Sequence, residues 1–481
     1  MPWFRLITSL ILLCLTLSAW GQSHTVYMVG DAGEPFEDGN PVIKLIQSHF
    51  EEDNSPSSII YLGDNVYPRG LPELGHPDRH QAEEIMKGQL DILKGYRGQV
   101  YVIPGNHDWE KGKKGGYQQI KNQEAFVEEY LAGILGDSAN TFLPDGGCPG
   151  PVEIELSEEV TLIILDTQWL LHPWEKPREI NGCEVGRYND VFAQLEEMVR
   201  RNDYKKVIVA AHHPMYSYGI HGGVSNAKQH IFPLTDVNES LYIPIPIIGS
   251  IYPLYRKLLG NIQDIQHPKY KAIRNTLEDI FSYHPNLVFV SGHEHSLQYI
   301  AKDSVHYIVS GSGSKSTFVK EKQFARYVHE GVGFGKLVFT PDGNVTLQFW
   351  SPQTPDTPIF EQVLFNKPYQ PLPKAEDFKV NFTDSTVVVN ASDQYDTNQP
   401  GLLGENYRAA WRTKIEVPVF DIGTEKGGLK ILKRGGGQQT RSLRLEAKDG
   451  KQYVLRSVEK YAEKAIPEAL KSTVGAEVQT V

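Results

Sequence analysis

Cysteine is scarce in this sequence, which leaves little scope for disulfide cross-links. The 481 residues include three cysteines, at positions 14, 148 and 183. Cys14 lies in an N-terminal segment that we expect to be removed, so Cys148 and Cys183 are the one pair that the mature chain can form. An oxidising compartment would permit that disulfide. Two free, buried thiols fit the sequence equally well.

Positive charge is also in deficit. The chain has 48 Lys and Arg residues against 59 Asp and Glu residues, which gives a formal net charge of -11. The electrostatics of the whole protein therefore do not favour binding to nucleic acid or to an anionic membrane. An acidic protein can still bind phosphate where bound metal ions reverse the local field.

Long hydrophobic runs are absent after the N-terminus, and no later segment is long enough to span a bilayer. Leu6 to Leu17 form a short apolar stretch after Arg5, and Ala19-Trp20-Gly21 offers small residues for cleavage. We interpret residues 1–21 as a signal peptide, because the apolar stretch is too short for a membrane span. An uncleaved membrane anchor is the alternative. The signal peptide predicts a protein that is secreted, periplasmic or at the cell surface.

The chain is long enough for two or three domains. In its first two thirds, short apolar runs rich in β-branched residues end in polar turns rich in Gly, Asp, Asn or His. Five of these runs are Thr25–Val29, Ser58–Leu62, Val100–Ile103, Lys206–Val209 and Asn286–Val290. Helix-like segments lie between several of them, at residues 78–93 and 189–201. Strands that alternate with helices predict an α/β domain, in which ligands gather at the carboxyl ends of the strands.

The polar turns carry side chains that bind metals. Two Asp, one Asn, three His and one Tyr stand in these turns, and they are Asp31, Asp64, Tyr67, Asn106, His212, His293 and His295. Mixed carboxylate and imidazole ligands suit iron, zinc or manganese rather than calcium. Two such ions held close together can clamp a phosphate and lower the pKa of a bound water.

Five blocks in order resemble those of the purple acid phosphatases, within the calcineurin-like metallophosphoesterases. The blocks are Gly30-Asp31-Ala32-Gly33, Gly63-Asp64-Asn65-Val66-Tyr67, Gly105-Asn106-His107-Asp108, Val209-Ala210-Ala211-His212 and Gly292-His293-Glu294-His295. Each block alone is a weak signal, whereas all five in order, each after an apolar strand, are a strong one. The resemblance covers residues 24–350 and implies an α/β catalytic domain with the four-layer αββα sandwich of metallophosphoesterases.

The resemblance also implies two metal sites. The first would be held by Asp31, Asp64, Tyr67 and His295, and the second by Asp64, as a bridge, with Asn106, His212 and His293. Most calcineurin-like enzymes carry a histidine where Gly33 stands, and Tyr67 would replace that ligand. Because a phenolate favours a ferric ion, the resemblance implies iron in the first site and iron, zinc or manganese in the second. The alternative is that Tyr67 is a turn or core residue.

His107 and His221 are the expected catalytic groups that bind no metal. His107 follows a ligand directly, and His221 lies nine residues after His212, where animal-type purple acid phosphatases have a comparable histidine. The resemblance implies that a metal-bound hydroxide attacks phosphorus, that His107 stabilises the phosphoryl oxygens and that His221 assists the leaving group. His213 is expected to support the ligands without binding metal. Asp108, which would anchor a turn, and Asp166, which ends a strand, are expected to be structural.

The predicted reaction is the hydrolysis of small-molecule phosphate monoesters, as in acid phosphatases. A phosphodiesterase or nucleotidase on the same fold is one alternative. A non-catalytic binding or scaffold protein at the cell surface is another. The set of ligand residues is intact, which favours an enzyme. No nucleic acid partner is expected.

A long insertion at residues 224–271 interrupts the α/β pattern. Its apolar, proline-punctuated stretch suits a lid over the site or a surface that touches lipid. We favour a loop packed on its own domain, because long loops usually pack against themselves.

The last part of the chain is expected to be separate from the catalytic domain. Residues 351–406 begin proline-rich and predict a linker followed by a strand pair. Residues 407–481 predict a small β-rich accessory domain, truncated if the chain is part of a longer protein. Within it, Ser442–Glu446 and Gln452–Val458 flank Asp449-Gly450 and predict a hairpin. This region is similar to one that follows the phosphatase domain in long metallophosphoesterases of Bacteroidetes, which implies association with the outer membrane through a missing downstream region.

Overall fold

The computed structural model describes most of the chain up to residue 366. The described ranges are 23–52, 55–136, 141–202, 205–232, 242–245, 250–282, 284 and 286–366, followed by the backbone of seven strands between residues 378 and 480. The predicted signal peptide, residues 1–21, lies outside the described residues. So do much of the insertion and most of the residues between the C-terminal strands.

The first sheet has the strand order β13-β12-β11-β1-β2-β3. Strands β1 (His24–Val29), β2 (Ser57–Tyr61) and β3 (Gln99–Val102) run parallel to one another. The other three are antiparallel neighbours, namely β11 (Phe334–Phe339), β12 (Asn344–Trp350) and β13 (Phe360–Asn366). The parallel strands therefore end at one edge of the sheet, where β1 and β2 lead into the first two sequence blocks.

The second sheet has the order β10-β8-β9-β7-β6-β5-β4. Its parallel strands are β5 (Val160–Ile164), β6 (Lys206–Ala210), β7 (Leu287–Ser291) and β9 (Val305–Ser310). The edges are antiparallel and consist of β4 (Val152–Ser157), β8 (Leu297–Lys302) and β10 (Ala325–His329). Strands β6 and β7 lead into the last two sequence blocks.

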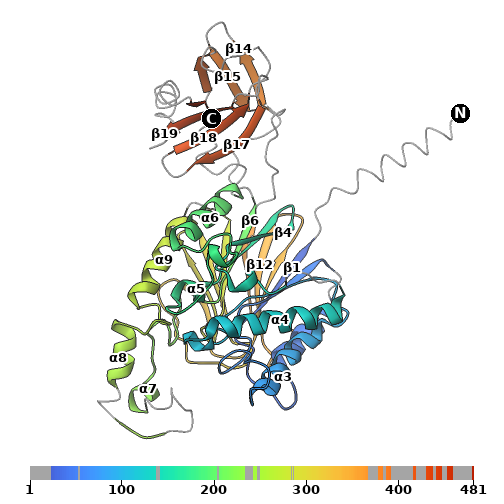
Figure 1. Ribbon diagram of the computed structural model, residues 1–481, viewed down its shortest axis with the longest axis vertical. Coiled ribbons are helices and arrows are strands. Elements are labelled where there is room, and N and C mark those ends of the chain that lie inside the picture. The colour runs from blue at the N-terminus through green and yellow to red at the C-terminus, as the bar shows by residue number, and fades with distance from the viewer. Residues whose placement is uncertain are drawn as a thin grey trace, which may run out of the picture.

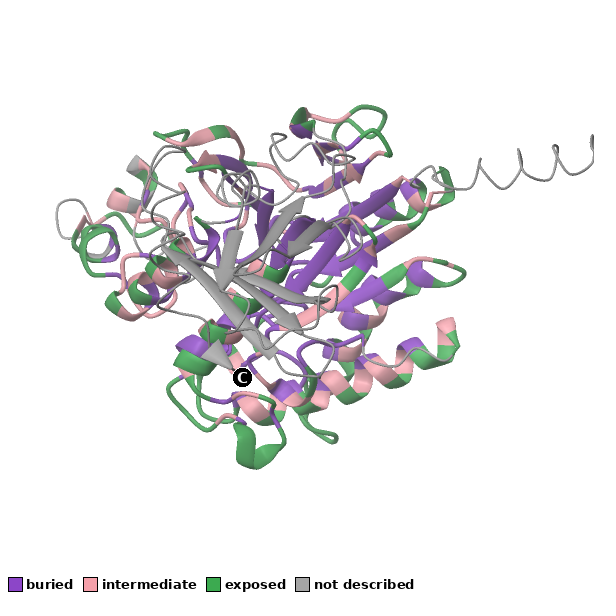
Figure 2. Ribbon diagram, turned by 90° about the horizontal axis from the view of Figure 1, so that it is seen from above, coloured by how far each residue is buried: buried purple, intermediate pink, exposed green. Residues whose placement is uncertain are grey.

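The strands are buried on both faces, because one face of each sheet packs against the other sheet and the opposite face packs against helices. Successive side chains of a strand point to these two faces in turn. On β1, Val26 and Met28 pack into a core between the two sheets, while Tyr27 and Val29 pack beneath the helices. The same alternation holds on β6, where Ile208 and Ala210 face the other sheet. Buried strands in Figure 2 accordingly lie at the centre, with helices outside them. The four-layer αββα sandwich is confirmed.

The helices that cover the sheets bury one apolar stripe each. They are α2 (Pro41–Glu52), α3 (Arg79–Leu90), α4 (Gly116–Leu135), α5 (Thr167–Leu171), α6 (Tyr188–Arg201) and α9 (Pro268–Phe281), several of which are labelled in Figure 1. The predicted helix at residues 78–93 is α3 and a 3₁₀ turn at Asp91–Leu93. In α6 the apolar stripe of Val191, Leu195, Met198 and Val199 is buried, as its spacing predicts.

The first sheet extends beyond the expected end of the catalytic domain. The sequence places a linker from residue 351, but β13 (Phe360–Asn366) pairs with β12 along its length. Pro352, Pro355 and Pro358 occupy the turn between the two strands, where no backbone N–H is needed for the sheet. The division of the chain at residue 350 stays a prediction, and the sheet itself continues to Asn366.

The described C-terminal strands form two small antiparallel sheets. One contains β14 (Phe378–Phe382), β15 (Thr386–Ala391) and β16 (Ile415–Pro418), and so includes the expected strand pair. The other contains β17 (Lys430–Gly436), β18 (Thr440–Glu446), β19 (Gln452–Val458) and β20 (Gln479–Thr480). The predicted hairpin is β18 and β19, with Glu446 opposite Gln452. This β-rich content agrees with the predicted accessory unit.

Two short helices lie in the insertion, α7 (Ala227–Ile231) and α8 (Ile251–Leu258). None of the described helices combines the length and the apolar character that crossing a bilayer requires.

Cys148 and Cys183 form a disulfide, which decides between the two readings that the sequence left open. Their Cα atoms are 5.6 Å apart, within the range that a disulfide spans. The bond ties the turn before β4 to the segment before α6 and closes a loop with a sequence separation of 35 residues.

We expect replacement of both cysteines by serine to lower the free energy of unfolding by about 4 kcal/mol. The reason is that the cross-link removes conformational freedom from the unfolded chain. Urea unfolding of the oxidised wild type, the reduced wild type and the double variant measures this. Reduced wild type and the variant should coincide, and equal stability of all three proteins would contradict the structural role of the bond.

Candidate dinuclear metal centre

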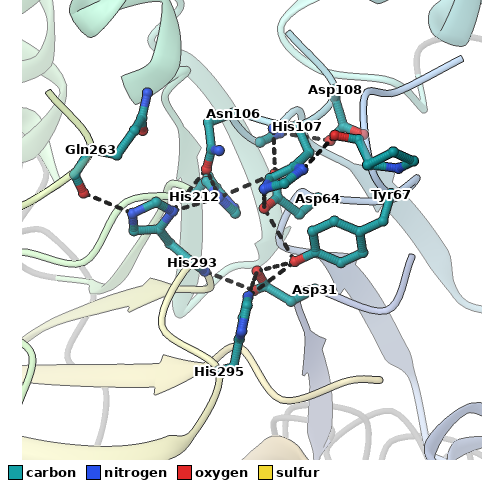
Figure 3. A network of polar contacts seen from close by, with 12 residues as sticks. Asp31, Asp64, Tyr67, Asn106, His107, Asp108, His212, Gln263, His293 and His295 are labelled. Carbon is teal, nitrogen blue, oxygen red and sulfur yellow. Dashed lines mark hydrogen bonds and ion pairs between the residues drawn. The ribbon is translucent and has the colours of Figure 1, made fainter. Parts of the chain in front are cut away.

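The predicted ligands come from loops that are far apart in sequence and meet at one edge of the two sheets. Asp31 follows β1, Asp64 follows β2, Asn106 follows β3, His212 follows β6 and His293 follows β7. Figure 3 shows these side chains pointing toward one another, together with those of two further predicted ligands, Tyr67 and His295. The structure thus gathers all seven residues in one place, as expected for the carboxyl ends of parallel strands.

The backbone at this edge is strained where it presents the central side chains. Asp31, Asp64 and His293 have φ angles of 58°, 54° and 67°, in the left-handed region that residues other than glycine adopt rarely. Hydrogen bonds across the blocks hold two of them, from Asp31 N to Gly63 O at 2.9 Å and from His293 N to Asp31 Oδ2 at 2.7 Å. Strain of this kind concentrates at functional sites, where the surrounding structure enforces it.

One group of donor atoms surrounds the hydroxyl of Tyr67. This oxygen is 2.9 Å from Asp31 Oδ1, 3.2 Å from His295 Nε2 and 3.3 Å from Asp64 Oδ2. Metal bonds of about 2.1 Å at right angles place neighbouring ligand atoms about 3 Å apart. The four donor atoms are therefore close enough to surround one metal ion, and the Tyr67 hydroxyl lies among them.

A second group of donors surrounds the amide oxygen of Asn106. Asn106 Oδ1 is 2.8 Å from His293 Nδ1 and 3.1 Å from His212 Nε2, and these two nitrogens are 3.2 Å apart. Asp64 Oδ1 is 3.4 Å from His212 Nε2. Asp64 thus contributes one oxygen to each group, the arrangement needed to bridge two metals. The buried trio of Asp64, His212 and His293 is also a metal-site candidate by the mutual closeness of its ligand atoms.

Carbonyl oxygens fix the orientation of both imidazoles in the second group. His212 Nδ1 lies 2.8 Å from Leu62 O, and His293 Nε2 lies 2.9 Å from Gln263 O. Because a carbonyl can only accept, each of these nitrogens carries the proton. The lone pairs of His212 Nε2 and His293 Nδ1 then face the shared centre, as metal-ligating histidines require.

The electrostatics of the centre favour a bound cation. Burial alone would raise the pKa of Asp64, but His212 and His107 hold it below its usual range. Burial would likewise lower the pKa of His212, but Asp64 and Asp31 outweigh burial and raise it to about 9. A buried site that attracts a proton this strongly also suits a metal ion, which would take the place of the proton.

Gly33 explains why tyrosine rather than histidine completes the first group. A Cβ atom at Gly33 would lie 2.6 Å from both Asn65 C and Val66 N, closer than real Cβ atoms approach. The backbone of the second block therefore passes directly over Gly33, and Tyr67 N donates to Gly33 O at 3.0 Å. Because Gly33 has no side chain, the backbone of the second block can pack against it and place Tyr67 among the donor atoms.

His107 lies at the first group and is tied to it through the backbone and the side chain. Its N–H donates to Asp64 Oδ1 at 2.8 Å, and its Nδ1 donates to Pro68 O at 2.7 Å. Its Nε2 is 3.9 Å from Asp64 Oδ2. Burial lowers the pKa of His107 to about 4, although Asp64 raises it. The imidazole of the free protein is therefore neutral near pH 7. Protonation would accompany the arrival of an anionic phosphate.

His221 lies against the second group. Its ring centroid is 4.1 Å from that of His293, and its Nδ1 is 3.0 Å from Asp264 Oδ1. Glu294, which stands between two predicted ligands, holds the loop that carries His221. The Glu294 carboxylate accepts from His221 N at 2.9 Å and from Ser217 Oγ at 2.7 Å. Glu294 was missed from the sequence, although its position inside the fifth block is a usable signal.

The insertion reaches the centre through residues that the sequence did not single out. Asp264 is fully buried and accepts two hydrogen bonds from the Arg256 guanidinium and one from Asn261 N. Burial would raise the pKa of Asp264, but His221 and Arg256 lower it to about 2. Asp264 is thus a charged anchor for His221. Its neighbour Gln263 supplies the carbonyl that orients His293. Neither residue belongs to a motif, so no signal in the sequence could have found them.

His213 supports the ligands without facing the shared centre. Its Nε2 is 2.7 Å from Gln263 Oε1 and its Nδ1 is 2.9 Å from Thr167 Oγ1, so both ring nitrogens are engaged. That His213 binds no metal stays a prediction.

Asp108 and Asp166 have structural partners, as expected. Asp108 accepts from Gly105 N at 2.7 Å and from Asn65 N at 3.1 Å, and so anchors the turn that presents Asn106. Asp166 accepts from Trp169 N at 2.9 Å and from Trp109 Nε1 at 2.8 Å at the start of α5.

This chain is distantly similar to several known proteins. Purple acid phosphatase 3 of Arabidopsis thaliana is 20% identical over 322 residues, which cover 64% of this chain and 69% of that protein. The structure of GAP50, the anchor in the inner membrane complex of Plasmodium, is 16% identical with a TM-score of 0.43 and covers 72% of this chain and 90% of its own. Purple acid phosphatase PPD1 from yellow lupin (Lupinus luteus) seeds is 13% identical with a TM-score of 0.44 and covers 73% of this chain and 55% of its own.

The family follows from a match to more than half of the chain. The model of the calcineurin-like phosphoesterases matches residues 24–311, a range that contains all five blocks and both donor groups. The similarity to purple acid phosphatases is distant by comparison. This chain belongs to the calcineurin-like phosphoesterase family.

Proposed function

We propose that this chain hydrolyses phosphate monoesters at a two-metal centre with iron in the first site and iron, zinc or manganese in the second. The observation that carries the proposal is the pair of donor groups that share Asp64, one of which includes a tyrosine. A phenolate is a charged oxygen ligand that proteins use for iron. The distant similarity to a purple acid phosphatase supports the same choice.

The chain's own residues divide the work of the reaction. The first metal would be held by Asp31, Asp64, Tyr67 and His295, and the second by Asp64, Asn106, His212 and His293. When bound, two metal ions supply an activated water and withdraw charge from the phosphoryl oxygens. The carbonyls of Leu62 and Gln263 keep the two imidazoles of the second site in the ligating tautomer.

His107 would stabilise the negative charge of the phosphoryl oxygens, and His221 would protonate the leaving group. His107 Nε2 faces Asp64 and would donate to a phosphoryl oxygen once the substrate favours protonation of the ring. His221 Nδ1 is held by Asp264, which orients the ring and leaves Nε2 to protonate the departing alkoxide. Glu294 fixes the backbone of His221 and so sets the distance of that ring from the centre.

We place this activity outside the cytoplasm. The predicted signal peptide at residues 1–21 supports this location. The disulfide between Cys148 and Cys183 supports it as well, because such bonds persist in oxidising compartments.

Metal-loaded protein should hydrolyse p-nitrophenyl phosphate, and bis(p-nitrophenyl) phosphate at least about tenfold more slowly. Asp64→Asn should reduce turnover by at least about a thousandfold, since it weakens both sites at once. Steady-state assays with metal analysis measure both effects. The control is Asp356→Asn, which alters an exposed carboxylate in the turn between β12 and β13. Protein that binds no metal and hydrolyses neither ester would make the chain a binding or scaffold protein, and faster diester hydrolysis would make it a phosphodiesterase.

The first site should give the iron-loaded protein a visible charge-transfer band. Tyr67→Phe should abolish the band while iron remains bound, because the other donors of the first group are unchanged. Absorption spectra with iron quantification test this, and Tyr117→Phe in α4 serves as the control tyrosine variant. An unaltered band in Tyr67→Phe, or a colourless wild type containing ferric iron, would refute the phenolate ligand.

Asp264→Asn should selectively slow the hydrolysis of phosphate esters that have a poor leaving group. The change keeps the shape of the side chain but removes the negative charge that positions His221. We expect kcat to fall about tenfold or more for an alkyl phosphate and little for p-nitrophenyl phosphate, whose leaving group needs no proton. An equal loss for the two substrates would show that Asp264 only maintains the structure.

A further inference from the structure

Helix α8 turns its apolar face away from the protein. Ile251, Leu254, Tyr255 and Leu258 follow the i, i+3, i+4, i+7 spacing of one helical face, and Leu259 extends it. These five side chains are 45–64% exposed. In a surface helix of a soluble domain this face normally packs onto the core, so its outward position calls for a partner. We call these five residues the α8 surface.

The opposite side of α8 is firmly attached, so the helix cannot roll over to bury the α8 surface. Pro253 is buried. Arg256 is buried as well, and its guanidinium binds the buried Asp264. The backbone of the helix also lies close to Gly223, where an added Cβ would be 3.0 Å from Lys257 Cα. The orientation of α8 is therefore set by a polar anchor rather than by its apolar side chains.

Three exposed lysines lie near one another, namely Lys257 on α8, and Lys320 and Lys322 in the segment between β9 and β10. Lys320 N donates to Tyr218 O at 3.1 Å, and Phe324 N donates to the Tyr218 hydroxyl at 3.2 Å, which fixes the loop between them. Burial lowers the pKa of Lys322, and so do its neighbours Lys257 and Lys320. The chain as a whole has a net charge of -11, so this basic cluster is a local exception, and it lies at a helix that exposes four large apolar side chains.

We propose that the α8 surface, with the lysine cluster beside it, docks this protein on an anionic phospholipid bilayer. Apolar side chains that enter the interface and lysines that meet the headgroup phosphates are the two attractions that hold such a surface. Tyr255 suits the boundary, because its ring is apolar and its hydroxyl can stay in the polar layer. A protein partner would supply apolar area for the helix but gives no reason for three lysines that form no ion pair with the described residues.

A docked α8 would also orient the metal centre. Arg256 joins this helix to Asp264, and Asp264 holds His221 at the second donor group. Figure 1 shows α8 with α7 at the periphery of the catalytic domain, outside the helices that cover the sheets. The helix can therefore reach a flat surface that the sandwich itself does not touch. The proposal does not depend on the reaction that the centre performs.

Vesicle flotation with the purified full chain tests the proposal. We expect the wild type to bind vesicles of phosphatidylcholine with phosphatidylglycerol, to bind pure phosphatidylcholine vesicles much less, and to be released by high salt. Leu254→Glu with Leu258→Glu should weaken binding by about tenfold or more, since two apolar contacts are replaced by charges. Lys257→Gln with Lys320→Gln should reduce the preference for phosphatidylglycerol.

Matched controls distinguish binding through the α8 surface from non-specific binding through other exposed apolar side chains. Ile180→Glu with Leu74→Glu removes two apolar side chains that are 92% and 81% exposed elsewhere on the domain, and it should bind vesicles like the wild type. Thermal unfolding checks that each variant is folded. No binding by the wild type, or equal binding by the α8 and control variants, would overturn the proposal. So would a dimer in sedimentation that the α8 variant alone disrupts, because the occupant would then be a second copy of the chain.

Discussion

The site depends on Asp64, a single carboxylate placed between two sets of donors. One of its oxygens is 3.3 Å from the Tyr67 hydroxyl, and the other is 3.4 Å from His212 Nε2. To stand there Asp64 adopts a φ of 54°, and the backbone at Gly105 packs so closely that any side chain at Gly105 would collide with it. A carboxylate that belonged to one group would leave two unrelated sites instead of one dinuclear centre.

The pairing of the two sheets is what closes this centre. Asp31, Asp64 and Asn106 are presented by the first sheet, whereas His212 and His293 are presented by the second. The core between the sheets consists of apolar residues such as Met28, Ile60, Ile208 and Val290, and its packing fixes how far apart the two halves of the site lie. Loss of packing there would spread the donors before it unfolded the helices. Structure and site are therefore stabilised by the same contacts.

Local patterns in the sequence predicted the central strands and the candidate ligands. The features that were missed depend on long-range contacts. Apolar runs that end in polar turns located β1, β2, β3, β6 and β7, because burial on both faces requires continuous apolar residues. Gly33 and Tyr67 could be paired in advance through the family resemblance, and the close backbone approach now gives the physical reason. Strand β13 was missed because its approach is proline-rich. Asp264 and Gln263 were missed because an insertion brings them to the site through contacts that no local pattern encodes.

Anomalous diffraction from crystals grown with iron and zinc tests the two-metal centre most directly. The structure predicts two peaks about 3–4 Å apart, one bonded to Tyr67 and His295, the other to Asn106 and His212, with Asp64 bonded to both. A single peak, or two peaks that do not share Asp64, would contradict the account.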